Sequence, residues 1–126
     1  MAADDTIEKA FRERILEDVR PWGRFRAYPY ELGSTVKIIT VEPGRALSLQ
    51  YHRRRAEFWV ILDPGLEVTI GEKVLHPEAG AELYIPREAL HRLRSVGGLP
   101  ARVMEIWIGA PDEDDIVRVE DEYRRK

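Results

Sequence analysis

The segment GRALSLQYHRRRAE, residues 44–57, carries side chains that can ligate a metal at short, regular spacing. Successive side chains of a β-strand point to opposite faces, so Gln50 and His52 share one face with Ser48. A four-residue link then leads to a second apolar run that opens with Glu57. The two runs are expected to pair as antiparallel neighbours, which brings an amide, an imidazole and a carboxylate together.

Short β runs continue on both sides of this hairpin, about ten residues apart and separated by turns rich in Gly, Pro and Asp. The expected strands span residues 36–41, 46–52, 57–62, 66–70, 83–85, 91–96 and 101–108. Many short strands at such intervals are typical of an antiparallel sandwich or barrel. We therefore predict an all-β domain that closes into a small barrel.

The two ends of the chain differ from this pattern. Apolar residues recur every fourth position among charged ones at Ile7, Phe11, Ile15 and Val19. This period predicts an amphipathic helix from Thr6 to about Val19, so residues 1–20 are assigned to an N-terminal helix and residues 21–126 to the barrel. The charged tail, residues 112–126, also contains apolar residues, and we expect a packed extension or a short helix there.

Composition limits the class of protein. A chain of 126 residues suits one domain, and 44% apolar with 34% charged residues is the balance of a folded protein. Without cysteine, any metal must be held by nitrogen and oxygen atoms. The formal charge of −3 and the lack of an apolar run of about 20 residues give no reason to expect nucleic acid or a membrane as a partner. We expect a cytoplasmic protein.

A second histidine completes the candidate metal site. His91 opens a later strand after Ile85-Pro86, and in a closed barrel it is expected to face the same interior. Two imidazoles, a carboxylate and an amide suit a divalent ion, with zinc favoured and manganese, iron, cobalt or nickel as alternatives. The remaining histidine, His76, stands before a proline in a turn-like segment, and we interpret it as structural or exposed.

Two longer motifs resemble those of the cupin superfamily. Residues 44–57 resemble the first cupin motif, a Gly, five residues, ligand-x-ligand and then a Glu after a short gap. Residues 80–91, GAELYIPREALH, resemble the second motif, with Glu88 replacing its usual second Gly and Ser95 standing where Asn is often found. The resemblance implies a small jelly-roll β-barrel.

More narrowly, the chain resembles the mannose-6-phosphate isomerase domain of type II bifunctional enzymes. The matching stretches are RPWG (20–23), LSLQ (47–50), RAEFW (55–59), YIP (84–86), HRL (91–93) and EDDIVR (113–118). The resemblance implies that Gln50, His52, Glu57 and His91 bind the metal, and that mannose 6-phosphate and fructose 6-phosphate are interconverted through an enediol. The guanylyltransferase domain that commonly precedes this domain in the family lies outside these residues, so nucleotidyl transfer is not implied.

Further polar residues are candidates for the remaining roles in such a reaction. Lys37 and Glu105 lie on strands that flank the predicted site, and either is a candidate general base. Arg55, which corresponds to an Arg of the family, and Arg92 are candidates for binding the phosphate. Because neighbouring strand residues face opposite ways, Arg92 is expected to point away from His91 unless a bulge intervenes.

The chain also departs from the family pattern. Arg53, Arg54 and Phe58 stand where histidines are usual, and Trp107 stands where a Gln is usual. The presumed ligands are retained, but the polarity of the pocket changes. An alternative function is therefore a non-catalytic, metal-containing cupin that binds a sugar or other small ligand. A third interpretation, iron-dependent oxidation with dioxygen, is disfavoured by the stretch at 55–59.

The expected partners are a sugar phosphate and a second copy of this chain. The amphipathic helix and the exposed edges of the barrel favour a homodimer, formed by strand exchange or sheet packing. Arg53 and Arg54 form a charge run, which we interpret mainly as a solvated loop.

Overall fold

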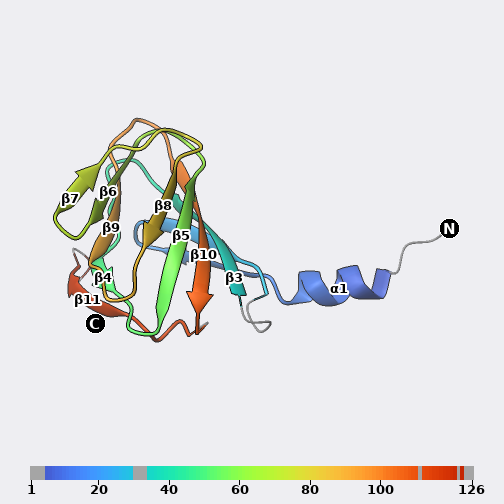
Figure 1. The fold of residues 1–126 in the computed structure, drawn as a ribbon. Coiled ribbons are helices and arrows are strands. Elements are labelled where there is room, and N and C mark those ends of the chain that lie inside the picture. The colour runs from blue at the N-terminus through green and yellow to red at the C-terminus, as the bar shows by residue number, and fades with distance from the viewer. Residues whose placement is uncertain (1–4, 30–33, 111, 122, 124–126) are drawn as a thin grey trace.

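The fold is built from strands, with one short helix in the part of the chain that the structure describes. The computed structural model describes residues 5–29, 34–110, 112–121 and 123 (Figure 1). The elements are α1 (Asp5–Glu13), β1 (Leu16–Arg20), β2 (Gly23–Ala27), β3 (Ser34–Val41), β4 (Leu49–Tyr51), β5 (Arg55–Ile61), β6 (Leu66–Ile70), β7 (Lys73–Leu75), β8 (Glu82–Ile85), β9 (His91–Ser95), β10 (Ala101–Gly109) and β11 (Val117–Glu120).

Two antiparallel sheets face each other across the core (Figure 1). The larger sheet, called sheet A, has the strand order β1-β2-β3-β10-β5-β8, and the smaller, called sheet B, has the order β11-β4-β9-β6-β7. Strand β10, which comes late in the chain, thus lies between β3 and β5 in the middle of sheet A. This arrangement confirms the predicted all-β barrel of jelly-roll type, with an N-terminal helix and a C-terminal extension.

Alternation along the strands decides what is buried between the sheets. In β5 the side chains of Glu57, Trp59 and Ile61 are buried, while Phe58 and Val60 between them are partly exposed. The buried apolar side chains of both sheets form one core, which includes Trp22, Phe25, Ile39, Val41, Trp59, Ile61, Leu66, Val68, Ile85, Leu93 and Val103. The site described below lies at one end of this core, where buried polar side chains replace apolar ones.

A glycine allows the first hairpin to approach its neighbour closely. Gly23 has φ of +149°, and a Cβ atom there would lie 2.0 Å from the carbonyl oxygen of Thr40 on β3. A side chain at this position therefore cannot be accommodated without moving the backbone. The hairpin of β1 and β2 depends on this close contact, because Gly23 is paired with Val41 at the end of β3.

The helix is shorter than the apolar period predicted. It ends at Glu13, and Leu16–Arg20 forms strand β1, which pairs with β2 along its whole length. The tight turn at Pro21-Trp22 allows this pairing, and Trp22 is buried in the core, which anchors the turn. The prediction of helix as far as Val19 is therefore wrong, because strand pairing overrides the local period.

Two further segments differ from expectation. Of the predicted strand 46–52, only Leu49–Tyr51 is a strand, and Ala46 makes a single bridge to Arg94. For the C-terminal tail we expected a packed extension or a short helix. The tail is packed, and its residues 117–120 form strand β11, which pairs with β4. Within the described parts of the chain, no helix is long and apolar enough to cross a membrane.

Candidate metal centre

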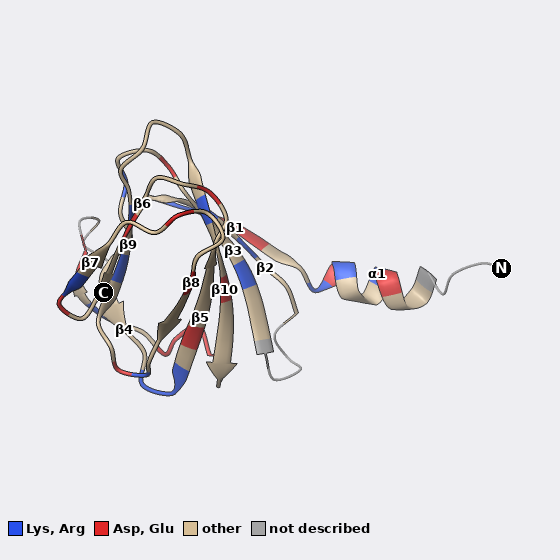
Figure 2. Cartoon of the chain, turned by 45° about the horizontal axis from the view of Figure 1, so that its top comes forward, with Lys and Arg blue, Asp and Glu red and all other residues tan. Residues whose placement is uncertain are grey.

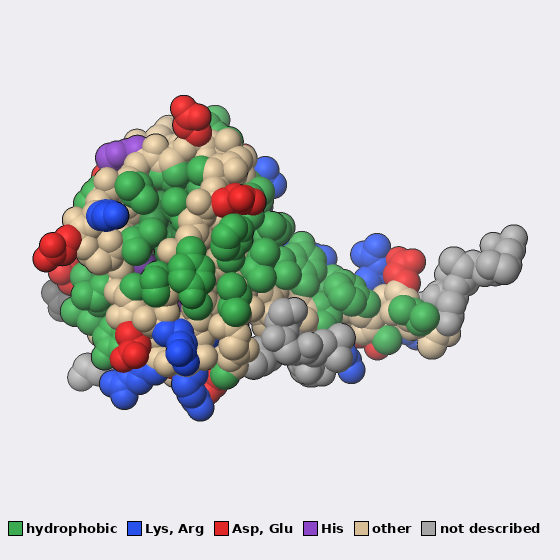
Figure 3. All heavy atoms as spheres, viewed as in Figure 1, with side chains coloured by type: hydrophobic (Ala, Val, Ile, Leu, Met, Phe, Trp, Pro, Cys, Tyr) green, Lys and Arg blue, Asp and Glu red, His purple; other side chains and the backbone are tan. Residues whose placement is uncertain are grey.

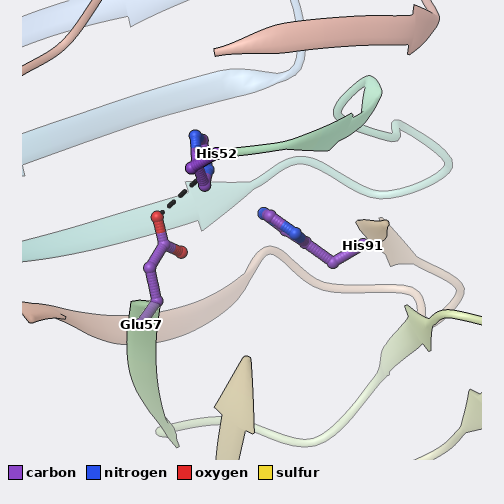
Figure 4. A group of neighbouring side chains, drawn as sticks. All are labelled: His52, Glu57 and His91. Atoms are coloured by element: carbon purple, nitrogen blue, oxygen red, sulfur yellow. Dashed lines mark ion pairs between the residues drawn. The ribbon is translucent and has the colours of Figure 1, made fainter. Parts of the chain in front are cut away.

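Three buried side chains converge at one end of the barrel (Figure 4). Potential ligand atoms of His52, Glu57 and His91 all lie within 4.8 Å of one another. Glu57 belongs to β5 in sheet A, His91 opens β9 in sheet B, and His52 follows β4 in sheet B. Each of the three residues is at most 3% exposed. The centre therefore joins the two sheets.

Backbone carbonyls orient both histidine rings. His52 Nδ1 lies 2.6 Å from the carbonyl oxygen of Asp115, and His91 Nδ1 lies 3.0 Å from that of Ala89. A carbonyl oxygen only accepts hydrogen bonds, so each Nδ1 carries the proton and donates it. In the neutral ring Nε2 then carries the lone pair that binds a metal ion, whereas the protonated His52 ring donates from Nε2 to Glu57 Oε2 at 3.2 Å.

Glu57 is held as a carboxylate by its neighbours. Its Oε1 accepts a hydrogen bond of 2.8 Å from Trp59 Nε1, and its Oε2 accepts one of 2.8 Å from Arg55 Nε. Burial favours the neutral acid, but the hydrogen bond with His52 and the charges of His91 and Arg55 outweigh it, so the pKa of Glu57 lies well below its usual range. Burial lowers the pKa of His91, which favours the neutral imidazole.

Arg55 is buried beside the ligands. Apart from its bond to Glu57, its Nη1 donates to the carbonyl oxygen of Asp112 at 3.0 Å, and its guanidinium carbon lies 3.4 Å from the centre of the Trp107 ring. Its Nη2 lies 3.2 Å from His52 Nε2, the nitrogen that would ligate a metal. The structure thus places Arg55 as a support for Glu57 and as a neighbour of the metal position.

The segment from Asp112 to Asp115 holds the loop that carries these residues. The carboxylate of Asp115 accepts hydrogen bonds from the backbone N–H groups of Arg53 and Arg54, at 2.9 and 2.8 Å. Its carbonyl oxygen orients His52, as described above. The sequence reasoning did not single out Asp115, although it lies in the EDDIVR stretch that carried the family resemblance.

A cavity of about 90 Å³ opens beside the three side chains. Gln50 lines it and stands opposite His91 in the register of β4 and β9, so its side chain shares the face of the ligands. Its Nε2 lies 3.5 Å from the carbonyl oxygen of Ser48. Of the two amide atoms, Oε1 is the one with the lone pairs that a metal ion needs.

The two candidate bases also line this cavity. Glu105 on β10 stands opposite Lys37 on β3, and both are buried; Figure 2 shows the charged bands on these strands. Trp107 Nε1 donates to Glu105 at 3.1 Å. Burial, with the nearby charge of Glu57, raises the pKa of Glu105 to about 7. Lys37 Nζ pairs with Glu113 at 2.6 Å and lies 4.6 Å from the Trp107 ring.

The arginines near the cavity divide into two kinds. Arg92 borders the cavity, but its guanidinium is directed to Glu120, with Nη1 3.1 Å from Oε1, as expected for a residue adjacent to His91. Arg118 stands opposite Gln50 in the register of β11 and β4 and therefore faces the cavity, which Arg20 of β1 also lines. The sequence reasoning missed these two, because only the strand register and the packing of β1 bring them there.

Positions that depart from the family pattern fall mostly outside the cavity. Phe58 lies on the outer face of β5, and Arg53 and Arg54 are exposed in the loop after β4, where Arg54 pairs with Asp112. Trp107 supports Arg55 and donates to Glu105. His76 is exposed and pairs with Glu67, away from the centre.

Glu88, in place of a glycine of the second motif, adopts a backbone conformation that suits glycine. Its φ is +67°, and its N–H donates to the carbonyl oxygen of His52 at 2.7 Å. The loop after β8 thus contacts the ligand loop through backbone atoms, and the left-handed conformation is strained for a residue with a Cβ atom.

Comparison with known families identifies relatives of this chain. The family model described as "Mannose-6-phosphate isomerase C-terminal" matches residues 8–121. The xanthan biosynthesis protein XanB of Xanthomonas campestris pv. campestris is 45% identical over 107 residues, which is 84% of this chain and 23% of XanB. The alginate biosynthesis protein AlgA of Pseudomonas putida is 42% identical over 111 residues, 87% of this chain and 23% of AlgA. The chain therefore spans about a quarter of the length of these relatives.

Solved structures share the fold at low identity. A cupin-2 domain from Rhodospirillum rubrum superposes with a TM-score of 0.67 at 16% identity, over 80% of this chain and 78% of that one. Oxalate decarboxylase from Bacillus subtilis superposes with a TM-score of 0.75 at 15% identity, over 86% of this chain and 31% of the enzyme. These likenesses establish the cupin fold.

Proposed function

This chain belongs to the mannose-6-phosphate isomerase C-terminal family and has the cupin fold, and from this we propose that it is a metal-dependent isomerase of mannose 6-phosphate and fructose 6-phosphate. One observation carries the proposal. The buried His52, Glu57 and His91 share a cavity with a second buried carboxyl, that of Glu105, whose pKa of about 7 suits a group that both accepts and returns a proton.

The donor set fits a divalent ion of the zinc type. Two neutral imidazoles and a carboxylate, with the amide oxygen of Gln50 as a fourth donor, leave positions open for substrate. A bound ion would polarise the oxygens on carbons one and two of the sugar. The carbonyls of Asp115 and Ala89 and the guanidinium of Arg55 keep the ligands oriented for it.

In the proposed reaction, Glu105 acts as the general base. Its carboxylate takes the proton from carbon two of mannose 6-phosphate and returns it to carbon one, while a hydroxyl proton moves from the second oxygen to the first. The charge of Lys37, opposite Glu105 on β3, would stabilise negative charge that develops on the enediol. Both residues are buried in the cavity lining, which keeps bulk water from the exchanging proton.

The size of the cavity bears on how the substrate lies. A volume of about 90 Å³ holds the reacting carbons and their oxygens but not a whole sugar phosphate, since ligand pockets usually measure about 300–1,000 Å³. The phosphate would therefore lie at the rim, where the partly exposed Arg20 and Arg118 supply positive charge. The same small volume also favours the alternative function, a metal-containing cupin that binds a small ligand without converting it, because a small ligand fits such a cavity whole.

An assay of the metal-loaded protein tests the proposal. Formation of fructose 6-phosphate from mannose 6-phosphate is followed for the wild type, for His52→Ala and for His76→Ala, whose side chain lies outside the centre. We expect activity in the wild type and in His76→Ala, and loss of at least about 100-fold in His52→Ala. If the wild type binds zinc, manganese, cobalt or iron but converts no substrate with any of them, the isomerase proposal is wrong.

A further inference from the structure

Trp107 is a large buried side chain that lies beyond the end of the connected apolar core. It is 1% exposed and belongs to the inner side of β10, where burial alternates along the strand. Figure 3 shows the hydrophobic side chains that gather on the other, outer side of β5, β8 and β10. On the inner side of β10 the connected core ends at Val103, and the next two buried residues of the strand are Glu105 and Trp107. Packing of the apolar core therefore does not explain a tryptophan at this position.

The contacts of Trp107 are with charged side chains. Its Nε1 donates to Glu105 Oε1 at 3.1 Å. The guanidinium carbon of Arg55 lies 3.4 Å from the centre of its ring, and Lys37 Nζ lies 4.6 Å from that centre. A cation is attracted to the negative face of an aromatic ring, and more strongly where both groups are removed from water, as these buried residues are. One side chain thus contacts an acid and two cations.

The three partners of Trp107 come from β10 and from both of its neighbours in sheet A. Arg55 opens β5 and Lys37 lies on β3, the strands that pair with β10 on either side. All three partners line the cavity beside the candidate metal ligands, whereas Trp107 is not part of that lining. Trp107 can therefore influence the cavity only through the residues that it contacts, as a positioning residue does.

The two parts of the indole act on different partners. The N–H holds one carboxylate oxygen of Glu105, which limits the directions in which that carboxylate can point. The ring holds the guanidinium of Arg55, whose Nε donates to Glu57 at 2.8 Å. Because Glu57 is a candidate metal ligand, the ring supports the metal position, while the N–H supports the candidate general base.

We propose that Trp107 is a positioning residue with two separable roles: its N–H orients the carboxylate of Glu105, and its ring keeps Arg55, and through it Glu57, in place. The first role rests on the proposed isomerase function, whereas the second concerns metal binding alone. A glutamine, the usual residue at this position of the family, carries its amide nitrogen as many bonds from the backbone as the indole nitrogen is. Tryptophan in its place therefore keeps a donor for Glu105 and adds a ring for Arg55.

Two substitutions separate the roles. Trp107→Phe keeps a ring and removes the donor, whereas Trp107→Gln keeps a donor and removes the ring. We expect Trp107→Phe to lower kcat for mannose 6-phosphate about tenfold or more, to change KM less than about twofold and to leave the zinc dissociation constant unchanged. Trp107→Gln should raise the zinc dissociation constant about tenfold, because Arg55 loses its ring contact, and should keep most of the wild-type kcat when zinc is saturating.

The titration of the Glu105 carboxyl gives a readout that needs neither metal nor turnover. Carbon NMR of the side-chain carboxyls in the metal-free protein measures it, with Glu105→Gln to assign the signal. Burial and the charge of Glu57 raise the pKa of Glu105, and Lys37, the Trp107 N–H and Arg55 lower it. Trp107→Phe should therefore shift the titration to higher pH, whereas Trp107→Gln should leave it near that of the wild type.

Leu66→Val is the control for a loss of packing alone. Leu66 is 1% exposed in the apolar core on β6, away from the charged cluster, so this variant should lower stability and leave kcat, zinc affinity and the Glu105 titration unchanged. If Trp107→Phe and Trp107→Gln each change all three quantities, or neither changes any, the proposal is wrong and Trp107 only fills space. A wild type without isomerase activity would refute the proposed function, whereas zinc affinity and the titration would still decide the roles of Trp107.

Discussion

Glu105 illustrates how burial, together with a neighbouring charge, tunes a single residue. Its carboxyl lies in the barrel interior near the carboxylate of Glu57, and burial first, then that charge, raises its pKa to about 7 from a usual 4.5. Lys37 and Trp107 act in the opposite direction but do not cancel the effect. With a pKa near neutrality, both the protonated and the ionised form of the carboxyl are populated at physiological pH. A group that transfers protons needs both forms.

We predict that the contribution of Glu105 to the free energy of unfolding falls as the pH rises from about 4.5 to about 7, whereas the lowered pKa of His91 acts in the opposite direction. In this window the folded protein holds a proton on Glu105 that the unfolded chain has released, so raising the pH favours unfolding, by about 3 kcal/mol at most. Urea unfolding at pH 5 and pH 8 measures the difference. Glu105→Gln should remove this part of the pH dependence, and an unchanged profile in that variant would contradict the prediction.

Glu88 shows a residue in conflict with its backbone. At φ of +67° a side chain is strained, whereas glycine is not, and its exposed side chain offers no compensating burial. We predict that Glu88→Gly is more stable than Glu88→Ala by about 1 kcal/mol, since alanine keeps the Cβ atom that causes the strain. Thermal unfolding of the two variants provides the measurement. Equal stability would mean that the loop relaxes around a Cβ atom.

The candidate ligands were easier to predict than the residues that support them. Gln50, His52, Glu57 and His91 were picked out because their spacing and chemistry are local properties of the chain, and they do line one cavity. Arg20, Arg118 and Asp115 reach the site from segments distant in sequence. Their positions depend on strand register and loop packing, which no local pattern encodes.

Among the elements, the segment Asp112–Asp115 fixes the ligand loop. Asp115→Ala removes an acceptor for two backbone N–H groups, those of Arg53 and Arg54, in a place where the carboxylate is only 7% exposed. We predict destabilisation of about 2–4 kcal/mol and zinc affinity lowered about 10- to 100-fold, because two buried N–H groups lose their acceptor and the loop that follows His52 is no longer anchored to the segment whose backbone carbonyl orients the His52 ring. Calorimetric titration with zinc and urea unfolding measure the two effects. Asp114→Ala, at an exposed neighbour, is the matched control and should change neither.

Element boundaries were predictable where local and tertiary preferences agree. Strands β5, β6 and β10 were expected within one or two residues, because turns and alternating burial mark both ends. Strand β1 was not predicted, since Val19 continues the every-fourth spacing of Ile7, Phe11 and Ile15. Only pairing with β2 after the turn at Trp22 makes Leu16–Arg20 a strand. Likewise, β11 is a strand only because it pairs with β4.

At the scale of the whole molecule, the centre is a junction between the sheets. Glu57 comes from sheet A, His91 comes from sheet B, and His52 follows strand β4 of sheet B. The ligands are thus brought together only when the barrel closes, so the unfolded chain has no comparable site. A ligand that binds only the folded state stabilises it in proportion to the logarithm of its concentration over its dissociation constant.

We therefore predict that zinc raises the melting temperature of the chain. At a free concentration about 100 times the dissociation constant the gain is about 2.7 kcal/mol, which corresponds to roughly 10 °C for a domain of this size. Scanning calorimetry with zinc, and again after a chelator, measures the shift and its reversal. His91→Ala should lose the shift because a sheet B ligand is gone, whereas His76→Ala should keep it, since that side chain pairs with Glu67 on the surface. An equal shift in both variants would mean that zinc binds elsewhere and that the junction does not hold the metal.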